Sequence, residues 1–334
     1  MLSPIFINDK QLTLVRFPLA QVNRSLQAWD SADEYLLNHI KEKQLIIDNS
    51  RVAIFNDTFG ALTTFFCSEE SIQKNLSVYC INDSYISKKG IAYNIEQNQL
   101  SDENITQLNC LEPLPTNINV ILFKIPKSKS LLIEQLIQIK NNVDKNTVFI
   151  AADRAKEIHS STLKLFEKYL GTTKTSLAAK KARLVFCLLD QQQNHASPFP
   201  TVWSLPNKAL GRDFSVSNLA NVYSREKLDI GARYFIENLP NVNANSQVID
   251  LGCGNGVIGL TVLAKQPTAQ IQFIDESHMA ISSAKINIKN NLPDLAERCQ
   301  FHLNDCLTNV ESNSVDLILC NPPFHQHTAT TDHI

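Results

Sequence analysis

The sequence predicts an α/β protein built from two tandem, doubly wound domains of the same kind. At 334 residues the chain exceeds the usual size of a single hydrophobic core, and 43% of its residues are apolar. An apolar stretch at 248–251 runs into a glycine-rich turn at 252–256, as parallel strands do where they enter a ligand-binding loop. A weaker version of this pattern lies in the N-terminal half. A duplicated α/β domain explains these observations together.

The N-terminal half aligns with the C-terminal half over three segments. Residues 80–98 (CINDSYISKKGIAYNIEQN) align without a gap to 273–291 (FIDESHMAISSAKINIKNN), so that Asn94 and Asn98 match Asn287 and Asn291. Upstream, 52–62 (VAIFNDTFGAL) align to 248–258 (VIDLGCGNGVI). Downstream, 120–126 (VILFKIP) align to 317–323 (LILCNPP). Repeats this far apart indicate a duplicated domain, and we expect the same order of strands in both copies.

Composition places the boundary between the copies. A strand at 184–189 ends the first copy, and residues 190–211 are rich in Gln, Asn, Ser and Pro. We therefore expect a first domain over 1–190, a linker over 191–211 and a second domain over 212–334. A helix that begins near Leu228–Asp229, with Asp229 as its N-cap, should lead into the second copy.

The two copies differ most at the glycine turn. Of the small residues in the first copy, only Gly60 remains, and larger side chains should crowd out a bound ligand. The first domain is therefore expected to keep the fold and to lose the site. Asp250, Gly252 and Gly254 are replaced by Ile54, Asn56 and Thr58.

In the second copy, polar residues follow three successive predicted strands. The strand at 271–275 ends in Asp275, whose carboxylate can accept from both hydroxyls of a ribose. The strand at 299–306 ends near Asp305, which can accept from an adenine amino group. The predicted cofactor-binding residues are Asp250, Gly252, Cys253, Gly254, Asn255, Gly256, Asp275, Glu276, Asp305 and Cys306.

The most specific motif follows the strand at 314–320 and consists of Asn321, Pro322, Pro323 and Phe324. The Asn321 side-chain oxygen can accept from an amino group. The two prolines fix the backbone and leave its carbonyls free to accept as well. The Phe324 ring offers a surface on which a flat base can stack. These four residues are the predicted catalytic residues for methylation of a planar NH2 group.

Strand, glycine turn, two acids and Asn-Pro-Pro-Phe, in this order, resemble the class I S-adenosylmethionine (SAM) methyltransferases. With the degenerate first copy and the segments 223–233 (YSREKLDIGAR), 32–37 (ADEYLL) and 158–171 (IHSSTLKLFEKYLG), the chain resembles the bacterial ribosomal RNA guanine-N2 methyltransferases. The resemblance implies two tandem Rossmann-like methyltransferase domains, SAM as cofactor, and a guanine amine of 23S rRNA, free or in a large-subunit precursor, as substrate. In that family, the segment before the glycine turn helps to roof the cofactor.

The resemblance also implies roles for the site residues. Asp250 would anchor the methionine end of SAM through water, Asp275 would hold the ribose, and Asp305 the adenine amino group, with the Cys306 N–H facing the ring. Asn321 and the next carbonyl would accept from the target amine of a base flipped out of its stack. Because the sulfonium is already activated, catalysis would consist chiefly of alignment.

Charge is distributed unevenly along the chain. The net charge is only −2, but Val120 to Arg183 contain 13 Lys or Arg against 5 Asp or Glu, a net of +8. This asymmetry is typical of a surface that binds a polyanion, although solvated helix faces also carry such charge. In the first copy, lysines replace Asn321 and Phe324, and lysines can meet phosphates as point charges. The predicted RNA-binding residues are Lys124, Lys127, Lys129, Lys180, Lys181 and Arg183.

Other features set limits on location, metal and length. No run of eighteen apolar residues predicts a membrane span, and eight cysteines without a CxxC pair indicate a reduced, cytoplasmic protein. His325-Gln326-His327 lacks further ligands at metal-site spacing, so no metal is expected. A complete domain of the family continues after the Asn-Pro-Pro-Phe strand, so the second domain is expected to be C-terminally incomplete, and the activity of the chain is left open.

Four alternatives stay open from the sequence. An adenine-N6 or glutamine-N5 methyltransferase would also present a planar nitrogen to Asn-Pro-Pro-aromatic. The rRNA substrate could be 16S rather than 23S. A dinucleotide dehydrogenase would explain the glycine turn but not residues 321–324. A non-catalytic RNA-binding or assembly protein would use the basic first domain alone.

Overall fold

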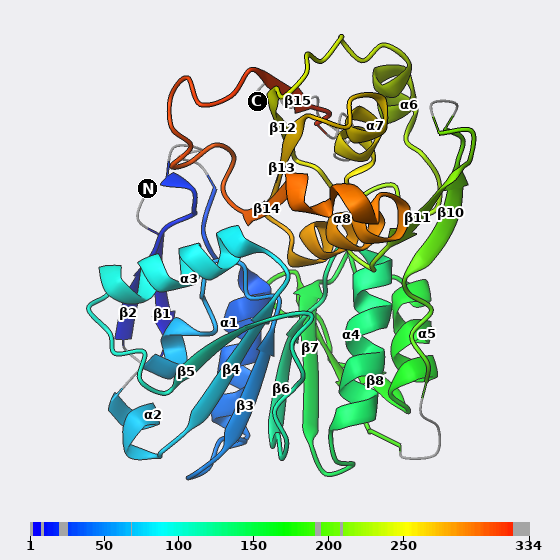
Figure 1. The fold of residues 1–334 in the computed structure, drawn as a ribbon. Helices are drawn as coiled ribbons and strands as arrows, with labels where there is room; N and C mark the ends of the chain where they lie inside the picture. Colours follow the sequence, from blue (N-terminus) through cyan, green and yellow to red (C-terminus); the bar gives the residue numbers. More distant parts are fainter. Residues whose placement is uncertain are drawn as a thin grey trace. The chain divides into compact units, whose positions relative to one another are not determined.

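The computed structural model describes residues 3–7, 10–19, 26–67, 69–190, 195–207 and 210–322. The chain divides into two compact units, Met1–Ser197 and Pro198–Ile334 (Figure 1). Within the described residues, no helix is both long and apolar enough to cross a membrane.

The first unit contains a seven-stranded sheet in the order β5-β4-β3-β6-β7-β9-β8. The first five strands in this order are parallel, and β9 runs antiparallel to both of its neighbours. A separate hairpin joins β1 and β2. The strands are β1 (Ser3–Ile7), β2 (Lys10–Leu14), β3 (Arg51–Phe55), β4 (Ser77–Asn82), β5 (Ile105–Asn109), β6 (Val120–Lys124), β7 (Val148–Arg154), β8 (Thr173–Thr175) and β9 (Ala182–Cys187). The helices are α1 (Ser31–Glu42), the 3-10 helix η2 (Thr64–Cys67), α2 (Glu69–Gln73), α3 (Tyr85–Gln97), α4 (Lys129–Asn142) and α5 (Ser160–Tyr169).

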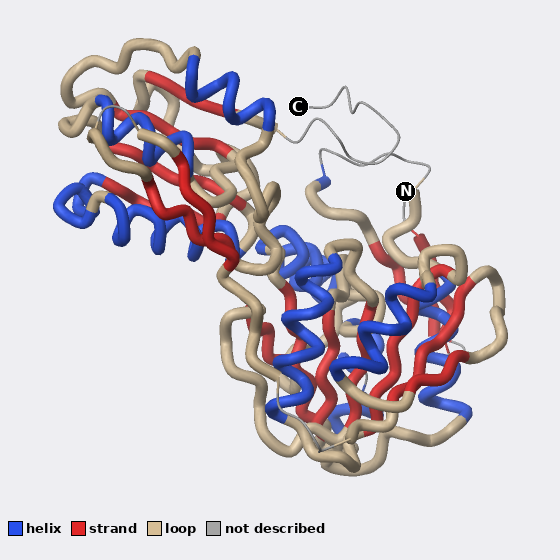
Figure 2. The backbone as a smooth tube through the Cα atoms, turned by 90° about the vertical axis from the view of Figure 1, so that its right-hand side faces the viewer, coloured by secondary structure: helices blue, strands red, loops and turns tan. Residues whose placement is uncertain are grey.

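Helices cover both faces of this sheet (Figure 2). Alternate strand residues such as Ile54 and Leu122 pack with Leu36 and Leu37 of α1 on one face. On the other face, the ring of Phe123 lies 6.2 Å from that of Phe166 on α5. Because both faces are buried, the central strands are apolar along their whole length, and the sheet is doubly wound.

The second unit repeats the first part of this plan. Its four-stranded parallel sheet has the order β14-β13-β12-β15, and a hairpin joins β10 to β11. The strands are β10 (Thr201–Leu205), β11 (Phe214–Asn218), β12 (Gln247–Leu251), β13 (Gln270–Asp275), β14 (Cys299–Leu303) and β15 (Leu317–Cys320). The helices are α6 (Ile230–Glu237), α7 (Val257–Lys265), α8 (His278–Asn291) and the 3-10 helix η3 (Pro293–Arg298). Asp229 caps α6, as predicted, by accepting from the Ala232 N–H.

The predicted duplication is confirmed by strand order and by individual hydrogen bonds. The order β5-β4-β3-β6 matches β14-β13-β12-β15. In the first unit, Asn94 exchanges two hydrogen bonds with the backbone of Val15 and donates to the Phe59 carbonyl. In the second unit, Asn287 makes the same three contacts with Ser217 and with the Asn255 carbonyl. Equivalent asparagines therefore join equivalent helices, strands and loops in the two copies.

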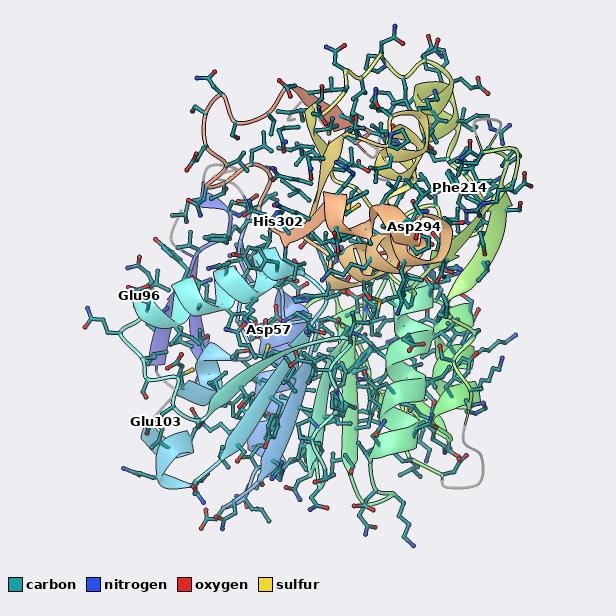
Figure 3. The ribbon with its side chains drawn as sticks, in the orientation of Figure 1. Asp57, Glu96, Glu103, Phe214, Asp294 and His302 are labelled. Carbon is teal, nitrogen blue, oxygen red and sulfur yellow. The ribbon has the colours of Figure 1, made fainter. Side chains whose placement is uncertain are left out.

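The boundary between the units falls inside the predicted linker, residues 191–211, but part of that segment forms a strand. The division falls after Ser197, and Thr201–Leu205 form strand β10 of the second unit. The partner strand β11 contributes the buried side chain of Phe214, which is labelled in Figure 3. Most of β10 is only half-buried or exposed, and the residues around it are rich in Gln, Asn, Ser and Pro, so the whole segment resembled a linker. Residues 198–211 thus belong to the second unit.

Candidate active site

Three alternate glycines with left-handed backbone follow β12. Gly252, Gly254 and Gly256 have φ angles of 65°, 55° and 76°, which side chains with a Cβ rarely adopt. A Cβ added at Gly252 or Gly254 would meet nothing within 4 Å, so these two glycines border open space. At Gly256, by contrast, a Cβ would lie 2.9 Å from the Ala284 Cβ. The first two glycines therefore leave room for a ligand, and the third lets α7 approach α8.

The end of β13 is tied to this turn. The Asp275 carboxylate accepts from the Gly254 N–H at 2.9 Å and from the Ser277 N–H at 3.0 Å. Asp275 is half-buried, and Glu276 follows it at the same exposure. The Asn255 side chain does not face the open space at Gly254. It is buried and donates a 2.7 Å hydrogen bond to Asn218. Asp275 is thus fixed beside the open space at Gly254.

Asp250 lies in β12, two residues before the glycine turn, and is buried. Its carboxylate accepts from the Gly259 N–H at 2.9 Å, in the first turn of α7. Burial raises the pKa of Asp250 to about 7. The Gly259 hydrogen bond opposes this shift, and the nearby Asp275 adds to it. Burial likewise raises the pKa of the Cys253 thiol well above its ordinary value, so this thiol stays protonated. Asp250 therefore connects the turn to α7 within this unit.

Strand register places the remaining predicted residues at the same edge of the sheet. Leu251 lies opposite Ile274 on one side and opposite Cys320 on the other, so Asn321 and Asp275 both lie level with Gly252. Leu303 lies opposite Asp275, which brings Asp305 and Cys306 just beyond that edge. Cys306 is exposed and has a φ of 49°. Asn321 and Pro322 are half-buried, and the predicted residues Pro323 and Phe324 lie outside the described residues.

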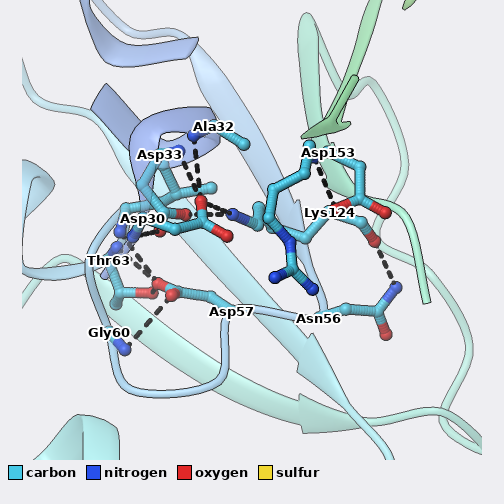
Figure 4. Close-up of polar contacts among 11 residues, drawn as sticks. Asp30, Ala32, Asp33, Asn56, Asp57, Gly60, Thr63, Lys124 and Asp153 are labelled. Carbon is cyan, nitrogen blue, oxygen red and sulfur yellow. Dashed lines mark hydrogen bonds and ion pairs between the residues drawn. The ribbon is translucent and has the colours of Figure 1, made fainter. Parts of the chain in front are cut away.

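In the first unit the corresponding space is filled by side chains (Figure 4). Asn56, the counterpart of Gly252, keeps a left-handed φ of 61°. Its amide donates to the Lys124 carbonyl at 2.9 Å and exchanges two 2.8 Å hydrogen bonds with Gln135 of α4. The position that is open at Gly252 is therefore occupied here. This filled position is consistent with the prediction that the first domain has lost the site, which stays a prediction.

Asp57, which the sequence reasoning missed, holds the turn of the first unit. Its carboxylate accepts from the N–H groups of Gly60, Leu62 and Thr63 and from the Thr63 hydroxyl. Burial raises the pKa of Asp57, although these hydrogen bonds oppose the shift. Amide groups that a bound anion could contact are thus already used by a side chain of the same unit.

The structure gives Lys124 a role other than the predicted contact with RNA. Its ammonium group lies 2.6 Å from Asp33 and 3.0 Å from Asp30, and only 16% of the side chain is exposed. Burial lowers the pKa of Lys124, but the two carboxylates outweigh burial and raise it above its ordinary value. Burial, opposed by Lys124, raises the pKa of Asp33 to about 6. Two carboxylates already neutralise Lys124, so it is not a free phosphate ligand.

The other predicted RNA-binding residues lie nearer to solvent. Arg183 is half-buried. The four lysines are exposed, namely Lys127, Lys129, Lys180 and Lys181. Among the described residues, no group of three or more His, Cys, Asp or Glu side chains could hold a metal ion.

The second unit has the features that a SAM site needs. SAM carries a nucleoside and a bulky sulfonium, and here two glycines leave open space where a Cβ would fit. A carboxylate, Asp275, is fixed at the end of the next strand, where a ribose would lie. The residues present fit the group. The equivalent first-unit positions, with Asn56 in place and Asn82 replacing Asp275, do not.

Comparison with known proteins decides the family. Two family models match the chain, the RLMG N-terminal domain over residues 3–191 and the Methyltransferase small domain over residues 213–334. A relative from Colwellia psychrerythraea, ribosomal RNA large subunit methyltransferase G, is 70% identical over 338 residues, which cover 100% of this chain and 86% of the relative. This chain belongs to the ribosomal RNA large subunit methyltransferase G family. A family member of the same name from Pseudoalteromonas translucida is 47% identical over 98% of this chain and 83% of its own length.

A solved structure has the same fold. A T. thermophilus 16S rRNA N2 methyltransferase, described in complex with AdoMet and guanosine, matches with a TM-score of 0.69. It covers 97% of this chain and 81% of the matched chain at 16% sequence identity. The predicted fold class, two tandem methyltransferase domains of Rossmann-like topology, is confirmed.

Proposed function

We propose that this chain transfers a methyl group from SAM to the exocyclic N2 of a guanine in 23S rRNA. The chain is a methyltransferase of the family named above, and SAM is its methyl donor. Bound SAM supplies an electrophilic methyl group on a positively charged sulfur. The finer assignments, guanine N2 and 23S rRNA, are supported by the names of the relatives and by the chemistry of residues 321–324.

One observation carries the proposal: Asn321 lies level with Gly252, at the edge that the open glycine turn borders. The Asn321 side-chain oxygen would accept from the guanine NH2, and the Pro322 carbonyl would accept from its second hydrogen. These contacts would direct the nitrogen lone pair towards the methyl group. The N–C bond would form as the S–C bond breaks, which leaves a neutral thioether, and N2 would then lose one proton to water. The chain would contribute alignment rather than a strong base, because the reacting sulfonium is already activated.

We propose that the cofactor-binding residues are those predicted, except Asn255, whose side chain is buried against Asn218, and that each has its own role. Asp275 would accept from the ribose hydroxyls, Asp305 would accept from the adenine amino group, and the Cys306 N–H would face the ring. Gly252 and Gly254 would make room. Phe324 would stack on a base that has left its helix, at a cost of about a few kcal/mol. Such a reaction takes place where ribosomes are assembled, so we propose a cytoplasmic location.

The proposal is tested by methyl transfer in vitro. The chain is incubated with labelled SAM and with 23S or 16S rRNA transcribed without modification, both as free RNA and as assembled subunits. We expect label in guanine N2 of 23S rRNA. Label in 16S rRNA alone would favour the small-subunit alternative, and label at an adenine would contradict the assignment of the amine. SAM binding without transfer to any of these RNAs would contradict the proposed activity for this chain.

A further inference from the structure

A strained hairpin turn presents two adjacent lysines in the first unit. Ala179 and Ala182 exchange both backbone hydrogen bonds, at 2.9 and 2.8 Å, and enclose Lys180 and Lys181. The φ angles of these lysines are 46° and 68°. Two-residue turns with positive φ at both positions match the twist of the strands, but they favour Asn and Gly. Side chains with a Cβ cost free energy there, and such strain is retained most often at ligand-binding sites.

A second basic segment lies beside the turn. The Ala155 N–H donates to the Lys181 carbonyl at 2.7 Å, which ties the loop after β7 to the hairpin. In the β7–β9 pair, Arg154 of β7 lies opposite Ala182 of β9, and Arg183 is the next residue of β9. Two segments that are separate in sequence therefore gather their charges at one end of β7. The cations are Arg154, Lys156, Lys180, Lys181 and Arg183.

The cations of the ion pairs at this place are exposed, so phosphates can reach them. Glu157 lies 3.7 Å from Arg154 and 3.6 Å from Lys156, and Glu34 lies 2.5 Å from Lys180. The exposed fractions of these three cations are 47%, 75% and 72%, and exposed pairs contribute little. Lys181 makes no ion pair with any residue that the structure describes. Lys124, by contrast, is held between two carboxylates and is largely buried.

The position in the fold favours a substrate contact over a merely solvated surface. Because β9 runs antiparallel to β7, the turn lies at the carboxyl end of the parallel strands. That is the edge at which open α/β sheets bind ligands, and the edge that carries the glycine turn in the second unit. The first unit has filled its cofactor space with Asn56 and Lys124, so its exposed charges at this edge are what remains available.

We propose that Arg154, Lys156, Lys180 and Lys181 bind the phosphate backbone of the rRNA substrate. The inference rests on the proposed function for the identity of the RNA. The ammonium groups act as point charges on phosphates, and such contacts position the RNA without reading its sequence. Binding releases counterions, so it weakens as salt rises.

The first test removes the charge of the turn in the full chain. Binding of unmodified 23S rRNA is measured from low to moderate KCl for the Lys180→Gln/Lys181→Gln variant. We expect affinity about three- to tenfold weaker at moderate salt, and a log–log salt slope flatter by about 1.5 to 2 units. SAM binding should not change. The matched control is Lys164→Gln/Lys168→Gln, which removes two exposed lysines of α5 from the same basic stretch and should leave the slope nearly unchanged.

A second variant separates RNA binding from folding. Lys180→Asn/Lys181→Gly installs the residues that this turn favours, so its Tm should rise by a few degrees while it loses RNA affinity to the same extent as the glutamine variant. Affinity and slope equal to those of the parent would overturn the inference, and so would an equal loss in the α5 control. Normal binding of free 23S rRNA with lost binding of the assembled subunit would indicate a ribosomal protein as the partner instead.

The two proposals fail separately. If the parent binds 23S rRNA through the turn but methylates no RNA, the proposed activity is wrong and the proposed phosphate contact is confirmed. If the parent methylates 23S rRNA and the turn variants bind and react normally, only the phosphate contact falls. If the parent does not bind the RNA at all, both are overturned.

Discussion

Lys124 has two carboxylate partners that lie far from it in the sequence. Asp33 and Asp30, from the start of α1, meet its ammonium group at the end of β6. Asp30 also caps α1 by accepting from the N–H groups of Ala32 and Asp33. One lysine therefore ties the first turn of a helix to the end of the central sheet, in the place where the second unit has Asn321.

Replacement of Lys124 should weaken the fold rather than RNA binding. Lys124→Met leaves two carboxylates without their partner, which we expect to destabilise the first unit by about 3 kcal/mol at pH 7.5. The loss should be smaller at pH 5, because Asp33, with a pKa of about 6, is then mostly protonated and needs no cation. Denaturant unfolding at both pH values measures this difference. Lys127→Met, at an exposed position, is the control, and equal stability of the two variants would contradict the structural role.

Asn321 should matter for the reaction and little for cofactor binding. Asn321→Ala removes an acceptor that serves the target amine as the methyl group moves, so methyl transfer should fall by about two or more orders of magnitude. SAM affinity should stay within about threefold, because Gly252, Gly254 and Asp275 are unchanged. Calorimetry and single-turnover kinetics check the two parts. Near-normal turnover by this variant would mean that another group orients the amine.

At the scale of elements, paired asparagines join α8 to strand β11. Asn291 exchanges two hydrogen bonds with the Ser215 backbone, and Asn287 exchanges two with Ser217. Asn287 alone also donates to the Asn255 carbonyl in the glycine turn. Both asparagines therefore hold strand β11 against α8, but only Asn287 also holds the glycine turn.

This difference gives a matched pair of variants. Asn287→Ala and Asn291→Ala should each destabilise the second unit by about 1 to 3 kcal/mol, because each leaves buried backbone groups unsatisfied. Only Asn287→Ala should also weaken SAM binding, since the turn at Asn255 loses its support. Unfolding curves and SAM titrations on both variants check this, and equal SAM affinity in the two would show that the turn holds its shape without Asn287.

The repeat explains which elements the sequence could predict. The positions of β12, β13 and β15 followed from apolar runs that end in glycine or polar residues, and the aligned segments 52–62, 80–98 and 120–126 located their equivalents in the first unit. Strand β10 could not be predicted, because its half-exposed residues carry no strong periodicity. The ion pair of Lys124 was also beyond reach, since its partners are 91 and 94 residues away in the chain. Sequence patterns reveal buried strands well and reveal long-range polar partners poorly.

Helix α6 shows what the duplication predicts about packing. Its residues Ile230 and Tyr234 are 86% and 70% exposed. In the first unit, the equivalent helix α1 packs on β7 and β9, and its residue Tyr35 is partly buried against that core. The described part of the second unit contains no strand equivalent to β7 or β9. Tyr234 follows its N-cap Asp229 at the same distance at which Tyr35 follows Asp30, so this position is exposed in α6 and partly buried in α1.

At the scale of the whole molecule, two copies of one fold differ at the same edge of the sheet. The second unit keeps three left-handed glycines and a fixed carboxylate at the strand ends. The first unit keeps the strand order but fills the same space with Asn56, Asp57 and Lys124. The side chains that fill this space in the first unit are stable there because each has a hydrogen-bond or ion-pair partner, as buried polar groups require.

The expected stoichiometry is one SAM per chain, bound by the second unit. A single-site isotherm is predicted, because an Asn side chain occupies in the first unit the space that Gly252 leaves open. Asn56→Gly should not create a second site, since Asp57 still holds the amides of the turn and Asn82 stands where Asp275 would accept from a ribose. Gly252→Asn should instead abolish the single site: a φ of 65° tolerates asparagine, but its side chain would enter the open space. Calorimetric titration of the parent and both variants measures this directly, and two equivalent sites in the parent would contradict the division of roles between the copies.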